Sequence, residues 1–128
     1  MKDFRKLKVW ERAHKLTLSI YMLTKQFPKD ELYGLTSQMR RSAFSIPTNI
    51  AEGRGRGSQA ELSRFLFFAM GSSSELEYQI ILSHDLHYIE DDKFVELSTE
   101  LNEFRRMLNA LILKVNHDKD VERLTANR

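Results

Sequence analysis

The spacing of apolar residues is the feature that most constrains how this chain folds. Two runs show it best. The first run steps through the chain by four and three residues in turn, at Val9, Ala13, Leu16, Ile20, Leu23 and Phe27. The last run steps in the same way, at Phe94, Leu97, Leu101, Phe104, Leu108, Leu111 and Val115. Because an α-helix has about 3.6 residues per turn, each run lies on one helix face, and the chain is predicted to be all-α.

Breaks in this pattern divide the chain into four long helices. Pro28 is expected to end a first helix over about residues 4–27, because proline cannot donate the next backbone hydrogen bond. A second helix is expected from residue 35 or 36 to Gly53, with a kink near residues 43–47 caused by Pro47. Two short helices, with Ser45 capping the second, are the alternative.

Capping signals mark the start of the last two helices. Ser58 and Glu61 form the pattern of a capping box, which predicts a third helix to about residue 86. Asp91 or Asp92 is expected to cap a fourth helix that ends near His117. Short connections favour an antiparallel up-down-up-down four-helix bundle over residues 1–117. Residues 118–128 lose the apolar spacing, and a disordered tail is expected there.

Composition excludes several classes of protein. There is no cysteine, which removes disulfide scaffolds, thiolate zinc sites, iron–sulfur clusters and cysteine nucleophiles. No apolar run approaches the roughly 18 residues of a membrane span, and the first residues lack the apolar core of a secretory signal. A cytoplasmic protein is expected.

Charge is unevenly distributed along the chain. Residues 1–60 contain twelve Lys/Arg and five Asp/Glu, a net +7, whereas residues 61–128 contain eight and thirteen, a net −5. A basic half favours an anionic partner such as RNA or DNA. The candidate contacts are the arginines of the second helix and of the glycine-rich turn after it, namely Arg40, Arg41, Arg54, Arg56 and Arg64. One alternative is that basic and acidic helices lie side by side and partly cancel each other's charge. Another is that Arg40 or Arg41 pairs with Glu52, with an acid of the third or fourth helix, or with a neighbouring subunit.

Metal and catalytic sites are not expected. A di-iron bundle needs two Glu-x-x-His motifs, and only Glu11 and His14 form one. His84 and His87 share a helix face, but surface histidines are the simpler interpretation. Polar residues cluster around Pro47, namely Ser42, Ser45, Asn49 and Glu52, but no nucleophile elbow of a serine hydrolase is present. Ser or Thr hydroxyls and Asn49 are expected instead to satisfy backbone groups that the proline frees. The sequence therefore predicts a protein that is not an enzyme and has no cofactor.

Aromatic residues outside the apolar stripes favour self-association. They exceed what one small bundle can enclose, and they are Trp10, Tyr21, Tyr33, Phe44, Phe67, Phe68 and Tyr78. Such residues are enriched at subunit contacts. The alternative is a single bundle with broad apolar faces.

The order of several motifs is distinctive. They include Val9-Trp10, Phe27-Pro28, the segments 33–42 and 45–53, and Ala69-Met70-Gly71-Ser72 with Glu75-Leu76-Glu77. Over about residues 4–116 the chain resembles the bacterial four-helix-bundle proteins encoded in intervening sequences of 23S rRNA genes, which carry a ribosomal protein family label. The resemblance implies a bundle that assembles as a ring, commonly a homopentamer. A related branch, the accessory proteins of diversity-generating retroelements, forms more basic pentameric barrels that bind nucleic acid and a reverse transcriptase.

Overall fold

The computed structural model describes residues 3–126, and these residues form four α-helices and two short 3₁₀ turns. The helices are α1 (Lys8–Thr24), α2 (Leu35–Gly55), α3 (Gln59–Asp85) and α4 (Asp91–Ala126). The 3₁₀ turns are η1 (Phe4–Lys6) before α1 and η2 (Lys29–Glu31) between α1 and α2. Within this part of the chain there is no strand, which confirms the predicted all-α class.

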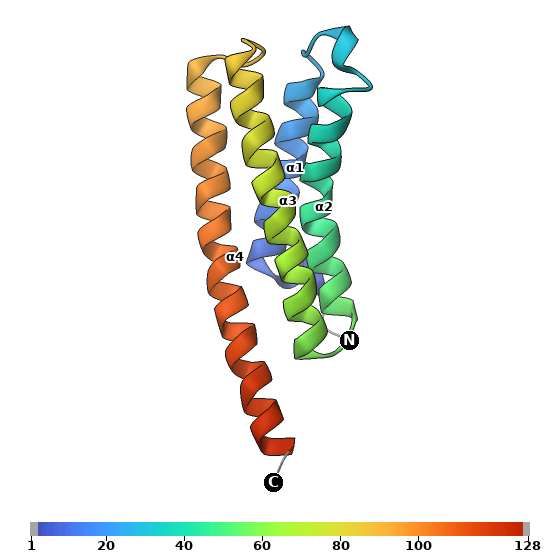
Figure 1. Ribbon diagram of the computed structural model, residues 1–128, viewed down its shortest axis with the longest axis vertical. Helices are drawn as coiled ribbons and strands as arrows, with labels where there is room; N and C mark the ends of the chain where they lie inside the picture. Colours follow the sequence, from blue (N-terminus) through green and yellow to red (C-terminus); the bar gives the residue numbers. More distant parts are fainter. Residues whose placement is uncertain (1–2, 127–128) are drawn as a thin grey trace.

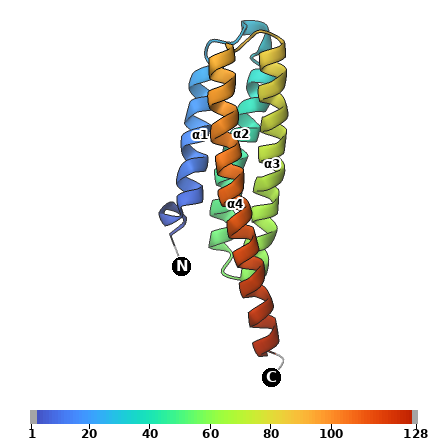
Figure 2. The same ribbon diagram turned by 90° about the vertical axis from the view of Figure 1, so that its left-hand side faces the viewer.

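The four helices lie side by side along one long axis (Figures 1 and 2). Contacts between α3 and α4 pair residues in opposite order. Ser63, Glu77 and His84 of α3 contact Asn116, Arg105 and Asp91 of α4 at 2.6, 3.0 and 2.6 Å. As residue numbers rise along α3 they fall along α4, so these two helices run in opposite directions.

The core consists of the stripes that the apolar spacing predicts. Along α4 the fully enclosed side chains are Leu97, Leu101, Phe104 and Leu108, each at most 2% exposed. Along α1 the stripe from Val9 to Ile20 is buried, and Phe27 closes the core after the helix has ended. The burial of these two stripes confirms the bundle, because each helix hides the face that its sequence marks as apolar.

The outer ends of the helices differ from expectation. Residues 4–6 form η1, capped by Asp3, and Leu7 is extended, so α1 begins at Lys8 rather than near Phe4. At the other end α4 continues to Ala126, where a disordered tail over residues 118–128 was expected; residues 127–128 lie outside the described residues. The last turns of α4 extend past the ends of the other helices (Figure 1), and the apolar residues there, Val121 and Leu124, are 47% and 67% exposed. Residues with high helix propensity and the ion pair of Asp120 with Arg123, three residues apart, favour helix over this last segment of α4.

α2 is one uninterrupted helix across Pro47, which excludes the two-helix alternative, while the kink stays a prediction. Pro47 has no N–H, so the carbonyl of Ala43, four residues earlier, loses its helical partner. The Thr17 hydroxyl of α1 lies 3.1 Å from that carbonyl oxygen and 2.8 Å from the carbonyl of Ala13. Ala13 retains its own helical hydrogen bond, so the Ala43 carbonyl is the group that depends on Thr17.

This contact makes a testable prediction about stability. Thr17→Val removes the hydroxyl, and we expect the free energy of unfolding to fall by about 1–3 kcal/mol, because a buried carbonyl loses its partner. In a Pro47→Ala background the backbone gains an N–H that can donate to the Ala43 carbonyl, and the same substitution should cost less. A double-mutant cycle by urea unfolding measures this coupling. Equal costs in both backgrounds would contradict the assignment.

Candidate docking groove and basic end

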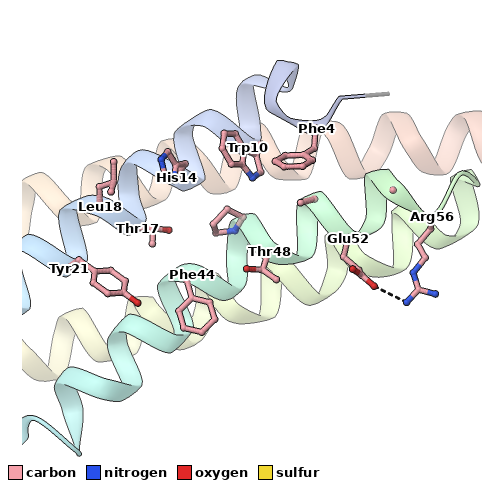
Figure 3. A pocket seen from close by; sticks show the side chains of 13 residues that line it. Phe4, Trp10, His14, Thr17, Leu18, Tyr21, Phe44, Thr48, Glu52 and Arg56 are labelled. Carbon is pink, nitrogen blue, oxygen red and sulfur yellow. Dashed lines mark hydrogen bonds and ion pairs between the residues drawn. The ribbon is translucent and has the colours of Figure 1, made fainter. Parts of the chain in front are cut away.

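An apolar groove of about 850 Å³ runs between the outer sides of α1 and α2 (Figure 3). Its walls are mainly aromatic or aliphatic, with Phe4, Trp10, Leu18 and Tyr21 on one side and Phe44 and Pro47 on the other. Polar side chains are few, and Glu52 is already paired with Arg56 at 2.9 Å. We call this surface the α1–α2 groove.

Local contacts keep the groove open and its aromatic rings in place. Phe4 packs edge-on against Trp10, and Trp10 stacks on His14, both with ring centroids 5.1 Å apart. At the other end the guanidinium of Arg40 lies over the Tyr21 ring, 4.9 Å from its centroid. Small residues on α2 leave the space between these rings, because Ala51 and Gly55 line the groove without filling it.

A second exposed apolar surface lies on the outer side of α3. Its members are Phe67, Phe68, Tyr78 and Ile81, which are 55%, 46%, 62% and 42% exposed. We call these four residues the α3 ridge. None of the seven aromatic residues that the sequence places outside the stripes belongs to the buried core, which confirms that part of the prediction.

The five candidate arginines fall into three environments. Arg40 donates from Nε to the Thr24 hydroxyl at 2.9 Å, so it ties α2 to α1, and no acid among residues 3–126 pairs with it. Glu52 pairs instead with Arg56, and Arg56 also reaches Glu61 at 3.8 Å. Arg64 pairs with Glu61 at 3.1 Å. The structure therefore uses three of the five in contacts within the protomer.

Arg41 and Arg54 are the two candidates without such contacts. The ion pairs found among residues 3–126 include neither side chain. Arg41 is exposed on α2. Arg54 lines a pocket of about 510 Å³ at the α2–α3 turn together with Glu122 of α4, and its Nε is buried without a hydrogen-bond partner in the described part of the chain. These two arginines retain unused hydrogen-bonding capacity.

Charge differs between the two ends of the bundle. The end at the α2–α3 turn carries Arg54, Arg56 and Arg64, and η1 with Arg5 and Lys6 packs against α2 there. We call this the basic end, although three of its cations, Arg5, Arg56 and Arg64, are paired with Asp3, Glu52 and Glu61. The opposite end holds the α3–α4 connection and η2, where acids predominate, namely Asp30, Glu31, Asp85, Glu90, Asp91 and Asp92.

Two hydrogen bonds order side chains at the acidic end. Tyr88 donates to a carboxylate oxygen of Glu31 at 2.9 Å, and this bond raises the pKa of the Tyr88 hydroxyl, with burial and the Glu31 charge acting in the same direction. His84 contacts Asp91 at 2.6 Å and stacks on Phe94. His84 thus joins α3 to α4.

Several side chains considered above as metal ligands or catalytic groups make ion pairs or hydrogen bonds within their own helices. Glu11 pairs with Lys15, and among residues 3–126 no three metal-ligating side chains gather closely enough to hold an ion. Ser45 and Asn49 hydrogen-bond carbonyls of their own helix, at Arg41 and Ser45. The Ala43 carbonyl that Pro47 frees lies 3.1 Å from the hydroxyl of Thr17 in α1, which confirms the expectation of a threonine or serine hydroxyl, whereas Asn49 bonds the Ser45 carbonyl instead.

Sequence reasoning identified the aromatic residues but not the groove that they form. Trp10, Tyr21 and Phe44 stood out because they leave the apolar stripes. Their meeting in one groove depends on how α1 is rotated against α2, which spacing within each helix does not determine. No described helix combines the length and hydropathy needed to cross a membrane.

Comparisons with known proteins agree with this architecture. A family model of 23S rRNA-intervening sequence proteins matches residues 5–110. A solved structure from Bacteroides thetaiotaomicron, a protein of unknown function from the S23 ribosomal protein family, has a similar fold with a TM-score of 0.74. The two sequences are 22% identical, and the match covers 81% of this chain and 94% of that chain. Among curated proteins, none matches. The chain belongs to the 23S rRNA-intervening sequence protein family.

Proposed function

We propose that this protein is a non-enzymatic, self-associating scaffold of the cytoplasm that binds RNA or DNA through its basic end and through Arg41, further along α2. The observation that carries the proposal is that the isolated bundle leaves two apolar surfaces in water, the α1–α2 groove and the α3 ridge. Large apolar patches on a folded protein mark interaction sites. A ring of identical copies, with a homopentamer favoured by the family resemblance, would cover both surfaces.

Nucleic-acid binding is supported by the arginines that the fold leaves free. Arg41 and Arg54 make no ion pair among residues 3–126, so phosphate contacts at these positions would not break an existing one. Arginine binds phosphate through two parallel hydrogen bonds. Repetition of the basic end around a ring would multiply these contacts.

Salt dependence tests this part of the proposal. If a single-stranded RNA contacts about three phosphate groups, its affinity should fall about 20-fold between 50 and 200 mM salt, because bound counterions are released. Arg41→Ala with Arg54→Ala should weaken binding and flatten this dependence. Lys25→Ala with Lys29→Ala removes equal charge at the acidic end and serves as the matched control.

The measurement is a fluorescence-anisotropy titration of labelled RNA and DNA. No binding at 50 mM salt would reject a nucleic-acid partner. It would favour the second candidate, a purely structural or protein-binding homo-oligomer, which the same two apolar surfaces support.

A further inference from the structure

We propose that the pocket at the α2–α3 turn, which Arg54 and Glu122 line, binds the 3′-terminal nucleotide of an RNA strand. The last phosphodiester group lies on Arg54, and the 2′- and 3′-hydroxyls donate to Gln59 and Glu122. The inference rests on the nucleic-acid binding proposed above and names the part of the strand that is recognised. We call this site the turn pocket.

Three helices form the turn pocket at the basic end of the bundle. Arg54 comes from the last turn of α2 and Gln59 from the first turn of α3, and Glu122 comes from α4, which runs past the α2–α3 turn (Figures 1 and 2). The volume of about 510 Å³ lies within the roughly 300–1,000 Å³ that is typical of sites for small ligands. The turn pocket shares no residue with the α1–α2 groove or the α3 ridge.

Hydrogen-bond donors gather where α2 turns into α3. The Nε of Arg54 is buried and has no hydrogen-bond partner among residues 3–126. The N–H groups of Gly57 and Gln59 donate to no backbone carbonyl in the same part of the chain, because they belong to the turn and to the open first turn of α3. Proteins use arginine and free backbone N–H groups to bind phosphate oxygens. This part of the turn pocket therefore suits an anionic group.

Two acceptors of the turn pocket also lack partners. The side-chain oxygen Oε1 of Gln59 is buried without a hydrogen bond from any described residue, and rotation of the side-chain amide turns it toward a ligand. The ion pairs found within residues 3–126 do not include the Glu122 carboxylate. A buried polar atom without a partner costs free energy, which a ligand that supplies the partner recovers. A ligand that satisfies the whole pocket must carry both an anionic group and hydrogen-bond donors.

These requirements favour the 3′ end of RNA over other parts of a nucleic acid. An internal nucleotide has a second phosphodiester group on its 3′ side, and the Glu122 charge would repel it. A 3′-terminal nucleotide carries a hydroxyl at that place, which can donate to a carboxylate. DNA lacks the 2′-hydroxyl, so Gln59 would stay without a donor. One phosphodiester group and two hydroxyls thus match the three unpartnered side chains one to one.

Three oligonucleotides of one sequence, each labelled at the 5′ end, test the assignment by fluorescence anisotropy. The first is RNA with a free 3′ end, the second is RNA with a 3′-phosphate, and the third is RNA whose last nucleotide is 2′-deoxy. We expect the free end to bind about 10-fold more tightly than the 3′-phosphate and about 5-fold more tightly than the deoxy end, because each change removes a hydrogen bond and the first also adds repulsion.

Variants assign each preference to one side chain. Glu122→Ala should abolish the discrimination against the 3′-phosphate, and Gln59→Ala the discrimination against the deoxy end. Glu90→Ala removes an exposed acid at the opposite end of the bundle and is the matched control, which should keep both preferences. Gln59→Ala should not lower the free energy of unfolding, because the buried oxygen has no partner to lose within the described chain. Urea unfolding checks this and separates lost recognition from lost structure.

Free adenosine 5′-monophosphate carries a phosphate and the same pair of hydroxyls, so it distinguishes a free nucleotide from a strand end. We expect calorimetry to show at least about 10-fold weaker binding than for RNA, because only a strand can also contact the other cations of the basic end. Equal affinity would reject a strand end as the ligand.

The remaining outcomes separate this inference from the proposed function. Absence of RNA binding at about 50 mM salt would reject both, because phosphate contacts are strongest at low salt. Equal binding of the free and the 3′-phosphorylated RNA would reject the turn-pocket assignment alone. A preference for the free end that survives Glu122→Ala would do the same.

Discussion

Replacing Phe104 with alanine is expected to lower the free energy of unfolding by about 3–5 kcal/mol. Phe104 is 1% exposed and lies at the centre of the α4 stripe, between Leu101 and Leu108. Its removal leaves a cavity among side chains of several helices, which cannot all move to fill it. Because small domains are stable by only about 5–15 kcal/mol, much of the total would be lost.

Urea unfolding followed by circular dichroism measures this effect. Leu113→Ala is the matched control, since Leu113 lies on the same helix but is largely exposed and should change stability by less than about 0.5 kcal/mol in the monomer. A loss below about 1 kcal/mol for Phe104→Ala would mean that α4 does not pack as described.

Alanine at two helical glycines should change stability in opposite directions. A Cβ on Gly53 would lie 2.8 Å from the Cβ of Phe65, so α2 and α3 would have to separate at this point. We expect Gly53→Ala to destabilise the protein by about 1–3 kcal/mol. Gly71→Ala meets no neighbour among the described residues and should stabilise α3 by up to about 1 kcal/mol, because glycine is a poor helix former.

Both glycine variants should be compared by thermal and urea unfolding at one protein concentration. The sign of the difference is decisive, because helix propensity alone predicts stabilisation at both positions. Stabilisation by Gly53→Ala would show that the backbones of α2 and α3 are not in close contact. Destabilisation by Gly71→Ala in a dissociated sample would place an unseen contact above that residue.

Much of the fold could be predicted because apolar spacing is a local property. The positions from Leu97 to Leu108 mark the buried face of α4 without any knowledge of its neighbours. Ser58 was likewise recognisable as a helix cap, and its hydroxyl accepts a hydrogen bond from the Glu61 N–H at 3.2 Å. Element ends were less predictable. The first helix was predicted to start at about residue 4, but Leu7 is extended and α1 begins at Lys8, because apolar spacing does not determine where a helix starts.

Partner choice between helices could not be predicted. The sequence shows that Pro47 frees the Ala43 carbonyl, but not that Thr17, 26 residues earlier, satisfies it. Similarly, one alternative paired Arg40 or Arg41 with an acid, and the sequence did not show that Arg40 contacts Tyr21 and Thr24 of α1. These contacts depend on the rotation and axial offset of α1 against α2. Several side chains could form each of these hydrogen bonds, and the packing of the core determines which of them come into contact.

The opposite charges of the two ends give each bundle an electric dipole along its long axis. A polyanion would attract one end and repel the other before contact, so encounters would begin in a preferred orientation. Added salt should then slow association more than it speeds release. In a ring of parallel copies the dipoles would add, and one rim would face the polyanion while the other turned away.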